Sequence, residues 1–326
     1  DRSPSRGLGD VYKRQLMRVA KRFIPVKLWN VQRKTSILKQ HKKVADFWTP
    51  IIDAYHNETI ERYALKPKKE LDTRKVIWQY WGQGLDSDDL PEIVRICFDS
   101  VDKHKADYQV IRLTDTTLSE YLDFPDFVRQ KRENAQFNRT FFSDLLRVAL
   151  LKAYGGVWLD ATILLTNRLP GKYEKLDFFM FQRSDDEKDK DYWENAFAYY
   201  FGWESDFKVR VLNSIIFAQK ENKVISILSD LLLYFWETQD SVPDYFFFQI
   251  LFHELITKYC PSENCPIVND CIPHIIQTKI NGNYDRISFG EAMKLTSMHK
   301  MAYFDDAAVT RLKPVSYTHL RAHETD

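Results

Sequence analysis

The sequence predicts an α/β fold in which helices cover the faces of a β-sheet. Segments typical of strands alternate with segments typical of helices between residues 75 and 259, and this alternation is the pattern of α/β proteins. A helical region with apolar residues at roughly helical spacing precedes them, at 36–66. Gly155 and Gly156 separate a largely apolar helix from a strand. These observations predict a sheet domain with an N-terminal helical extension.

The expected elements follow one another with clear boundaries. Pro67 and the charged residues 68–75 close the N-terminal helical region. The expected strands, rich in β-branched and aromatic residues, cover 75–80, 109–113, 157–159, 178–182 and 214–218. The expected helices cover 91–104, 117–124, 140–154, 225–238 and 246–259. In helix 140–154, Ser143 is a candidate N-cap and the glycine pair supplies the C-cap.

These elements divide the chain into four segments. Residues 1–15 and 314–326 show no apolar periodicity, and we expect both to be non-native tails. Residues 16–72 are expected to form a basic helical extension. Residues 73–313 are expected to form the α/β domain.

The composition argues against several classes of protein. The 326 residues include 47 Lys and Arg and 46 Asp and Glu, for a net charge of +1. A nucleic-acid-binding protein usually has a surplus of cations, so we expect no nucleic-acid partner. No apolar run reaches the roughly 20 residues of a membrane-spanning helix, and no signal-peptide core is visible. The four cysteines lack C-x-x-C spacing, which favours reduced thiols in a cytoplasmic protein.

The basic charge is concentrated near the N-terminus. Eleven Lys and Arg residues and no Asp or Glu lie between Val11 and Ala45. One interpretation is a solvated basic helix. The other is an amphipathic segment, residues 16–45, that contacts an anionic membrane surface, where each basic residue contributes on the order of 1 kcal/mol. The second interpretation would place the protein peripherally on the inner face of the plasma membrane.

The most informative stretch is 141–166. Asp144 and Arg147 are three positions apart and share one face near the start of an apolar, largely buried helix. Asp160 and Thr162 follow the next strand and project the same way from its carboxyl end, where open α/β sheets bind ligands. A carboxylate at this position suits a hard divalent cation that also binds phosphate oxygens. The alternatives are a structural ion pair and a turn or cap.

The segment SDLLRVALLKAYGGVWLDAT, residues 143–162, resembles the central motif of glycosyltransferase family 32 and the related capsular polysaccharide synthesis proteins. The resemblance covers about residues 75–305. It implies a GT-A fold, with a mixed and mainly parallel sheet. It also implies transfer of a hexose-type sugar, with retention of configuration, from a nucleotide-sugar donor. The usual donor carrier is UDP, and the implied acceptor is a growing capsular polysaccharide or a lipid-linked saccharide.

The resemblance also implies roles for particular residues. Asp144 would hydrogen-bond the hydroxyls of the donor sugar, and Arg147 would lie against the sugar or the diphosphate. Asp160 is the first acid of the family's Asp-x-Asp motif, which binds Mn²⁺ or Mg²⁺. Thr162 stands where the general family has the second acid. A hydroxyl is a weaker ligand than a carboxylate, so strict metal dependence is in doubt.

Other residues complete the implied site. Trp81 would lie against the base, although a core position is the alternative. Asn213 would line the donor sugar or stabilise a turn. Asp244 would face the sugar or the acceptor hydroxyl, or cap a helix. His299 would complete the metal site, or be structural, and Lys300 would neutralise the diphosphate. The predicted site is therefore catalytic at Asp144, Arg147 and Asp244, donor-binding at Trp81, Asp144, Arg147, Asn213 and Lys300, and metal-binding at Asp160, Thr162 and His299.

Two other functional classes are open. A sugar nucleotidyltransferase would carry a basic, glycine-rich phosphate loop near its first strand, whereas residues 81–84 read Trp-Gly-Gln-Gly. A non-catalytic carbohydrate-binding or membrane-scaffold protein would tolerate Thr162. A cluster of aromatic residues after the charged loop 183–191 is either core or a surface for an acceptor sugar; it comprises Tyr192, Trp193, Tyr199, Tyr200 and Trp203.

Overall fold

The computed structural model describes residues 26–71, 75–86, 90–282, 284–301 and 312. The predicted tails, 1–15 and 314–326, lie outside the described residues, as do residues 16–25 of the basic segment. The described strands are β1 (Val76–Tyr80), β2 (Gln109–Leu113), β3 (Gly156–Leu159), β4 (Ile163–Leu165), β5 (Phe178–Gln182), β6 (Val211–Ala218) and β7 (Met298–Lys300).

The central sheet is mixed but mainly parallel. Its strand order is β2-β1-β3-β6-β5. Strand β1 pairs in parallel with β2 and β3, whereas β6 is antiparallel to both β3 and β5. In the described residues, four of the five strands of this sheet therefore run in one direction and β6 opposes them. The predicted α/β class with a mainly parallel sheet is confirmed.

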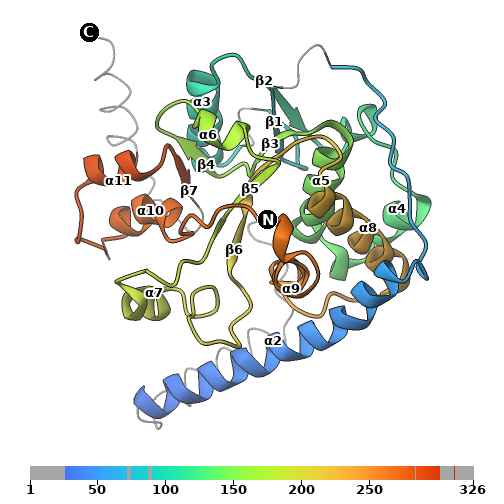
Figure 1. Cartoon of the computed structure of the whole chain (residues 1–326). Helices are drawn as coiled ribbons and strands as arrows, with labels where there is room; N and C mark the ends of the chain where they lie inside the picture. The colour runs from blue at the N-terminus through green and yellow to red at the C-terminus, as the bar shows by residue number, and fades with distance from the viewer. Residues whose placement is uncertain (1–25, 72–74, 87–89, 283, 302–311, 313–326) are drawn as a thin grey trace.

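Helices lie on both sides of this sheet (Figure 1). Helix α5 contacts β1, β3 and β6, and α8 packs on α5. Helix α3 packs against β4, away from α5 and α8 (Figure 1). The described helices are α2 (Val26–His56), α3 (Glu92–His104), α4 (Asp126–Lys131), α5 (Arg139–Tyr154), α6 (Gly171–Glu174), α7 (Lys190–Ala196), α8 (Lys223–Thr238), α9 (Phe247–Glu254), α10 (Ile275–Ile280) and α11 (Phe289–Leu295).

The glycine pair allows α5 to turn directly into β3. Gly155 has φ +74° and Gly156 has φ +100°, a region that favours glycine. A Cβ atom on Gly156 would lie 2.5 Å from the carbonyl oxygen of Val76 in β1. The missing side chain therefore lets β3 enter the sheet beside β1 at the position that the sequence predicts.

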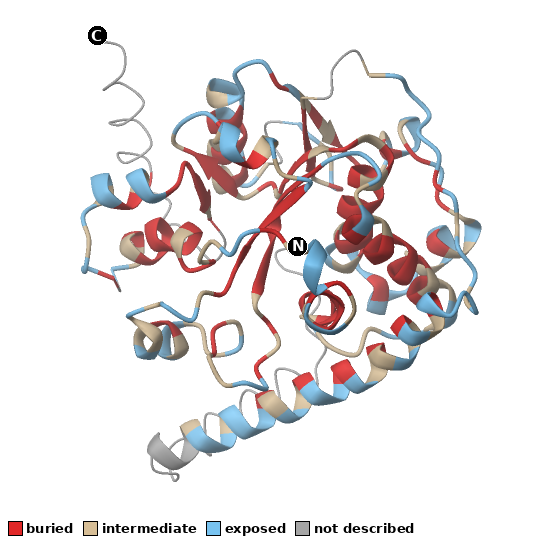
Figure 2. Ribbon diagram, in the orientation of Figure 1, coloured by how far each residue is buried: buried red, intermediate tan, exposed pale blue. Residues whose placement is uncertain are grey.

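The N-terminal helix is part of the main hydrophobic core. The inner face of α2 is buried while its outer face is exposed (Figure 2). Val44, Trp48 and Ile52 are fully buried, and Trp48 Nε1 donates a hydrogen bond to the Phe247 carbonyl of α9 at 3.0 Å. Helix α2 and the α/β domain thus share one core, although the predicted division at residue 72 stays a prediction.

The end of α2 differs from the sequence expectation. The helix predicted over 36–66 runs from Val26 to His56. Glu58 adopts a positive φ of 57°, and Thr59 N donates to the Ala54 carbonyl at 2.9 Å. This pattern is that of a Schellman motif, which satisfies the last carbonyls and ends the helix.

The start of α5 also differs from the expectation. The N-cap is Asn138, whose side chain accepts a hydrogen bond from Thr140 N at 2.9 Å. Ser143, the predicted cap, lies inside the helix and donates its hydroxyl to the Thr140 carbonyl at 2.7 Å. Asn and Ser are about equally good caps, so residue type alone did not locate the helix start.

A second, two-stranded sheet was not predicted. Strands β4 and β7 pair antiparallel, with Ile163 opposite Lys300 and Leu164 opposite His299. Each strand has three residues, which is too short for a recognisable pattern. No helix in the part of the chain that the structure describes combines the length and apolarity needed to cross a bilayer.

Candidate active site

A cavity of about 1100 Å³ opens where β1 and β3 end. Trp81 follows β1 and Asp160 follows β3, and both line this cavity. The first turns of α5, the start of α9, the segment 195–201 and Lys300 of β7 form the other walls. The cavity therefore lies at the carboxyl edge of the parallel strands, which is the usual ligand position in open α/β sheets.

Asp144 and Arg147 form an ion pair on the buried wall. Arg147 Nη1 lies 2.9 Å from Asp144 Oδ1, and the two side chains are 4% and 7% exposed. Arg147 also donates to the Ser143 carbonyl at 3.0 Å, to Ser143 Oγ at 2.9 Å and to the Asn213 carbonyl at 3.0 Å. These bonds hold the guanidinium in one orientation.

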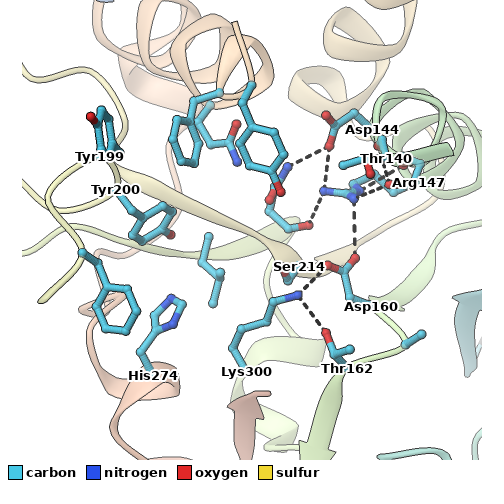
Figure 3. A pocket seen from close by; sticks show the side chains of 18 of the residues that line it. Thr140, Asp144, Arg147, Asp160, Thr162, Tyr199, Tyr200, Ser214, His274 and Lys300 are labelled. Carbon is cyan, nitrogen blue, oxygen red and sulfur yellow. Dashed lines mark hydrogen bonds and ion pairs between the residues drawn. The ribbon is translucent and has the colours of Figure 1, made fainter. Parts of the chain in front are cut away.

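Asp160 lies beside this pair. Its Oδ1 is 3.5 Å from Arg147 Nη2 and accepts a hydrogen bond from Trp158 Nε1 at 2.8 Å. Its Oδ2 accepts from Lys300 Nζ at 2.9 Å, and the same ammonium donates to Thr162 Oγ1 at 3.0 Å. Figure 3 shows these groups converging on one cavity. The structure therefore brings together the three charged groups that the sequence motif contains, and adds Lys300 to them.

The two carboxyl groups differ in protonation. Burial raises the pKa of Asp144 to about 7, against the attraction of Arg147 and with the repulsion of Asp160. Burial also raises the pKa of Asp160, but the positive charges of Lys300 and Arg147 outweigh the effect of burial and lower this pKa to about 2. Asp160 is therefore an anion at neutral pH, whereas Asp144 is close to its midpoint.

The cavity has more cationic than acidic side chains. In the described chain, the cationic lining residues are Arg33, Arg139, Arg147 and Lys300, and the acidic ones are Asp144 and Asp160. The surplus is two positive charges when both acids are ionised. A wall with this balance favours an anionic ligand such as a diphosphate.

Trp81 and Asn213 both line the cavity. Trp81 lines the cavity and packs against Val94, Phe98 and Ala161 on its other side, so it is partly a core residue as well. Asn213 is in β6, lines the cavity, and donates from Nδ2 to Asp144 Oδ1 at 2.9 Å. The turn alternative for Asn213 is wrong, because the residue is in the middle of a strand.

His299 faces away from the cavity. Neighbouring residues of a strand point to opposite faces, so His299 points away when Lys300 points in. Its ring is fully buried, with Nε2 3.2 Å from Thr166 Oγ1, and burial lowers its pKa to about 3. This placement corrects the expectation that His299 completes a metal site with Asp160.

Asp244 is absent from the residues that line the cavity. Its Oδ1 accepts from Phe246 N at 2.8 Å, and its carbonyl accepts from Phe247 N at 3.3 Å. Asp244 therefore stabilises the turn before α9 and occupies neither the cavity wall nor the N-cap position, which is that of Phe246. Its neighbours Tyr245 and Phe246 line the cavity instead.

Sequence reasoning missed several lining residues. Arg139 lies at the rim, with Nε 2.8 Å from Asp115 Oδ2. His274 and Gln249 line the cavity, and within the described residues His274 Nε2 and Gln249 Oε1 have no hydrogen-bond partner. No local pattern marks these three.

The aromatic cluster divides between core and cavity. Trp193 is buried, while Tyr199 and Tyr200 line the cavity (Figure 3). Tyr199 is 57% exposed, and Tyr245, which lines the cavity as well, is 54% exposed. The wall formed by segment 195–201 and the start of α9 therefore carries two partly exposed rings.

The expected Mn²⁺ or Mg²⁺ has a poor set of ligands here. Hard divalent cations prefer about six or more oxygen ligands, usually with carboxylates among them. Asp160 and Thr162 offer one carboxylate and one hydroxyl, and Lys300 binds both. Across the described ranges, no three His, Cys, Asp or Glu side chains are grouped as a metal site requires. The residues present do not fit the metal.

The fold and the cavity define an α/β protein with a cationic ligand site at the carboxyl edge of its sheet. A family model described as capsular polysaccharide synthesis protein matches residues 27–319. The chain belongs to this family. The more specific resemblance to glycosyltransferase family 32 stays a prediction.

Comparisons with single proteins add little. The solved structure of the PaToxG glycosyltransferase is 12% identical to this chain, with 89% of this chain and 97% of that chain covered and a TM-score of 0.34. A TM-score of this size supports no inference about function. No curated protein matches the chain in sequence.

Proposed function

We propose that the protein is a GT-A-type glycosyltransferase that moves a hexose-type sugar from a nucleoside-diphosphate donor to a growing capsular glycan or a lipid-linked saccharide. The observation that carries the proposal is the grouping of Asp144, Arg147, Asp160 and Lys300 in one cavity at the carboxyl ends of β1 and β3. Membership of a capsular polysaccharide synthesis family supports the acceptor class. UDP is the first nucleotide to test.

The proposed chemistry separates charge inside the cavity. Breaking the bond between the anomeric carbon and the diphosphate leaves positive charge on the sugar and negative charge on the phosphate. Preorganised charges that face both sites lower the barrier. Lys300 supplies positive charge for the phosphate, with Arg139 at the rim, and Asp144 supplies carboxylate oxygen on the sugar side. Front-side attack, which retains configuration, is our working mechanism.

The acceptor is proposed to enter along the aromatic wall. The exposed rings of Tyr199 and Tyr245 offer flat apolar surfaces, and such rings cover the faces of sugars while polar neighbours bind the hydroxyls. Gln249 and His274 lie on the same wall with unsatisfied polar atoms. These groups support a carbohydrate acceptor rather than a small apolar one.

Hydrolysis of the donor tests the proposal. Wild-type protein and an Asp160→Asn variant are incubated with a panel of UDP-hexoses, and released UDP is measured. We expect slow hydrolysis by the wild type and at least an approximately 100-fold loss in the variant, because the carboxylate that orients Lys300 loses its charge. Asp126→Asn, an exposed acid of α4 outside the cavity lining, is the matched control and should retain full activity.

Other results would contradict the proposal. Exchange of pyrophosphate into the donor would indicate a nucleotidyltransferase. Binding of saccharides without any turnover would indicate a carbohydrate-binding protein. Normal hydrolysis by Asp160→Asn would remove Asp160 from the machinery.

A further inference from the structure

The ammonium group of Lys300 occupies the position that a divalent cation would need. Its Nζ lies 2.9 Å from Asp160 Oδ2 and 3.0 Å from Thr162 Oγ1. These are the two residues that the Asp-x-Asp resemblance assigns to the metal. Figure 3 shows Lys300 between them, with its side chain directed into the cavity.

Backbone pairing brings Lys300 to this position. Lys300 is opposite Ile163 in the β4–β7 ladder, and Met301 N donates to the Thr162 carbonyl at 2.8 Å. Asp160 is fixed from the other side, where its N donates to the Ser214 carbonyl at 2.9 Å. The lysine therefore lies in a strand, and its two partners lie in the short turn between β3 and β4, which backbone hydrogen bonds hold to β6 and to the end of β7.

The remaining contacts leave little space for a metal on this carboxylate. Asp160 Oδ1 is bound by Trp158 Nε1 and faces Arg147 Nη2. A divalent cation that approached Oδ2 would meet the Lys300 ammonium, so two like charges would share one oxygen. Thr162, in place of a second acid, removes the charge that would balance both of them.

We propose that Lys300 replaces the divalent cation, so that the protein transfers sugar without a metal; this inference rests on the proposed function. A lysine ammonium has three donors, two of which bind Asp160 and Thr162. The third is available to a donor phosphate oxygen. The side chain is 14% exposed, which is consistent with one free direction toward the cavity.

The transfer step balances without a further reagent. The bond from the anomeric carbon to the diphosphate oxygen breaks, and its electron pair stays on that oxygen beside Lys300. The acceptor hydroxyl oxygen forms the new bond to the anomeric carbon. Its proton passes to the departing phosphate oxygen. The role of Lys300 in this step is to supply charge rather than a proton.

The first test needs only the wild-type protein. UDP-hexose hydrolysis is measured in EDTA, in Mn²⁺ and in Mg²⁺, and Mn²⁺ binding is measured separately by electron paramagnetic resonance. We expect rates within about twofold of one another, since no step uses the ion, and no tightly bound Mn²⁺. Hydrolysis that EDTA abolishes and Mn²⁺ restores would overturn the inference and leave the proposed function standing. Absence of both donor binding and hydrolysis would overturn both.

Variants of the lysine provide the second test. Lys300→Met should lose at least about 100-fold in hydrolysis, because the developing negative charge is unbalanced, and Lys300→Arg should recover part of the loss. Lys294→Met, the same change at an exposed lysine of α11, is the matched control. The double variant Thr162→Asp with Lys300→Ala restores a two-acid site and should bind Mn²⁺. Full activity of Lys300→Met would overturn the inference.

Discussion

At the scale of single residues, Asp144 has surroundings that act on its protonation in opposite directions. Arg147 attracts the carboxylate, but Arg147 also faces Asp160 and is shared between two acids. Burial therefore dominates and raises the pKa of Asp144 to about 7. An unfolded aspartate has a pKa near 3.9. Between about pH 4 and pH 7, Asp144 therefore holds a proton in the native state that it has lost in the unfolded state.

This difference predicts a pH dependence of stability. Because the native state holds more protons, its free energy of unfolding should fall as pH rises from about 4 to about 7, by at most about 1.4 kcal/mol per pH unit from this group. Asp144→Asn removes the titration. The stability of the variant minus that of the wild type should therefore increase between pH 5 and pH 7 and then level off, as measured by urea unfolding.

Asp160→Asn tests the coupling between the two acids. The pKa of Asp160 is about 2 in the folded protein, so above pH 5 this carboxyl carries the negative charge that helps to raise the pKa of Asp144. Without that charge the pKa of Asp144 should fall, so the stability of this variant minus that of the wild type should also increase between pH 5 and pH 7, but by less than for Asp144→Asn. The buried histidines titrate equally in all three proteins and cancel. A constant difference for Asp144→Asn would show that Asp144 is already ionised in the folded state.

At the scale of elements, the connection from α5 to β3 determines where Asp160 lies. Gly156→Ala would place a Cβ atom 2.5 Å from the Val76 carbonyl at φ +100°. We expect destabilisation by at least about 2 kcal/mol, from backbone strain and displacement of β3. Urea unfolding measures the change.

Gly290→Ala is the matched control. Gly290 lies inside α11, and a Cβ atom there would meet nothing within 4 Å. Alanine has the higher helix propensity, so this variant should be unchanged or up to about 1 kcal/mol more stable. Equal stability of the two variants would indicate that β3 tolerates a side chain beside β1.

Sequence patterns located the long elements and failed at the short ones. Strands 109–113 and 178–182 were predicted with the bounds that the structure has, because β-branched and aromatic residues are concentrated in them. Strand β7 has three residues and no such pattern. Its alternation already requires His299 and Lys300 to face opposite ways, but only the pairing with β4 decides which of them reaches the cavity.

The site residues that the sequence could predict are likewise those close together in the chain. Asp144, Arg147 and Asp160 are close in sequence, so one helix, one turn and one strand are enough to predict their proximity. Asp244 lies in the turn before α9, whereas Gln249 lies inside the helix and lines the cavity. A sequence pattern does not locate the start of a helix closely enough to tell which of the two reaches the cavity. The contact of Lys300 with Asp160 depends on pairing between distant segments, which local reasoning cannot supply.

At the scale of the whole molecule, α2 connects the basic segment to the cavity. Helix α2 packs on α9, whose first residues form the aromatic wall, and Arg33 of α2 lines the cavity itself. Deletion of α2 would expose the core around Trp48. Membrane contact by this segment should therefore be tested with surface substitutions and not by truncation.

We predict that the exposed face of α2 contributes to binding of anionic membranes. Lys39→Glu with Lys43→Glu changes two exposed lysines of α2. If each contributes about 1 kcal/mol at the surface, partition into phosphatidylserine vesicles should fall at least about tenfold. Sedimentation with vesicles at two salt concentrations measures it.

Lys175→Glu with Lys294→Glu is the control for total charge. Both residues are exposed and lie outside α2, and the double change alters the net charge equally. Vesicle binding should be nearly unaffected. Equal loss in the two double variants would mean that net charge alone governs the interaction, and full binding by the α2 variant would remove this helix from it.

The contact between Lys300 and Asp160 joins positions 140 apart in the chain. Every strand of the central sheet has been synthesised by Ala218, long before Lys300 leaves the ribosome. A prematurely terminated polypeptide can therefore contain every strand of the sheet and still lack the charge that receives a phosphate. Partial products of synthesis that end before Lys300 would be inert rather than wastefully hydrolytic, because they lack the ammonium group that receives a phosphate.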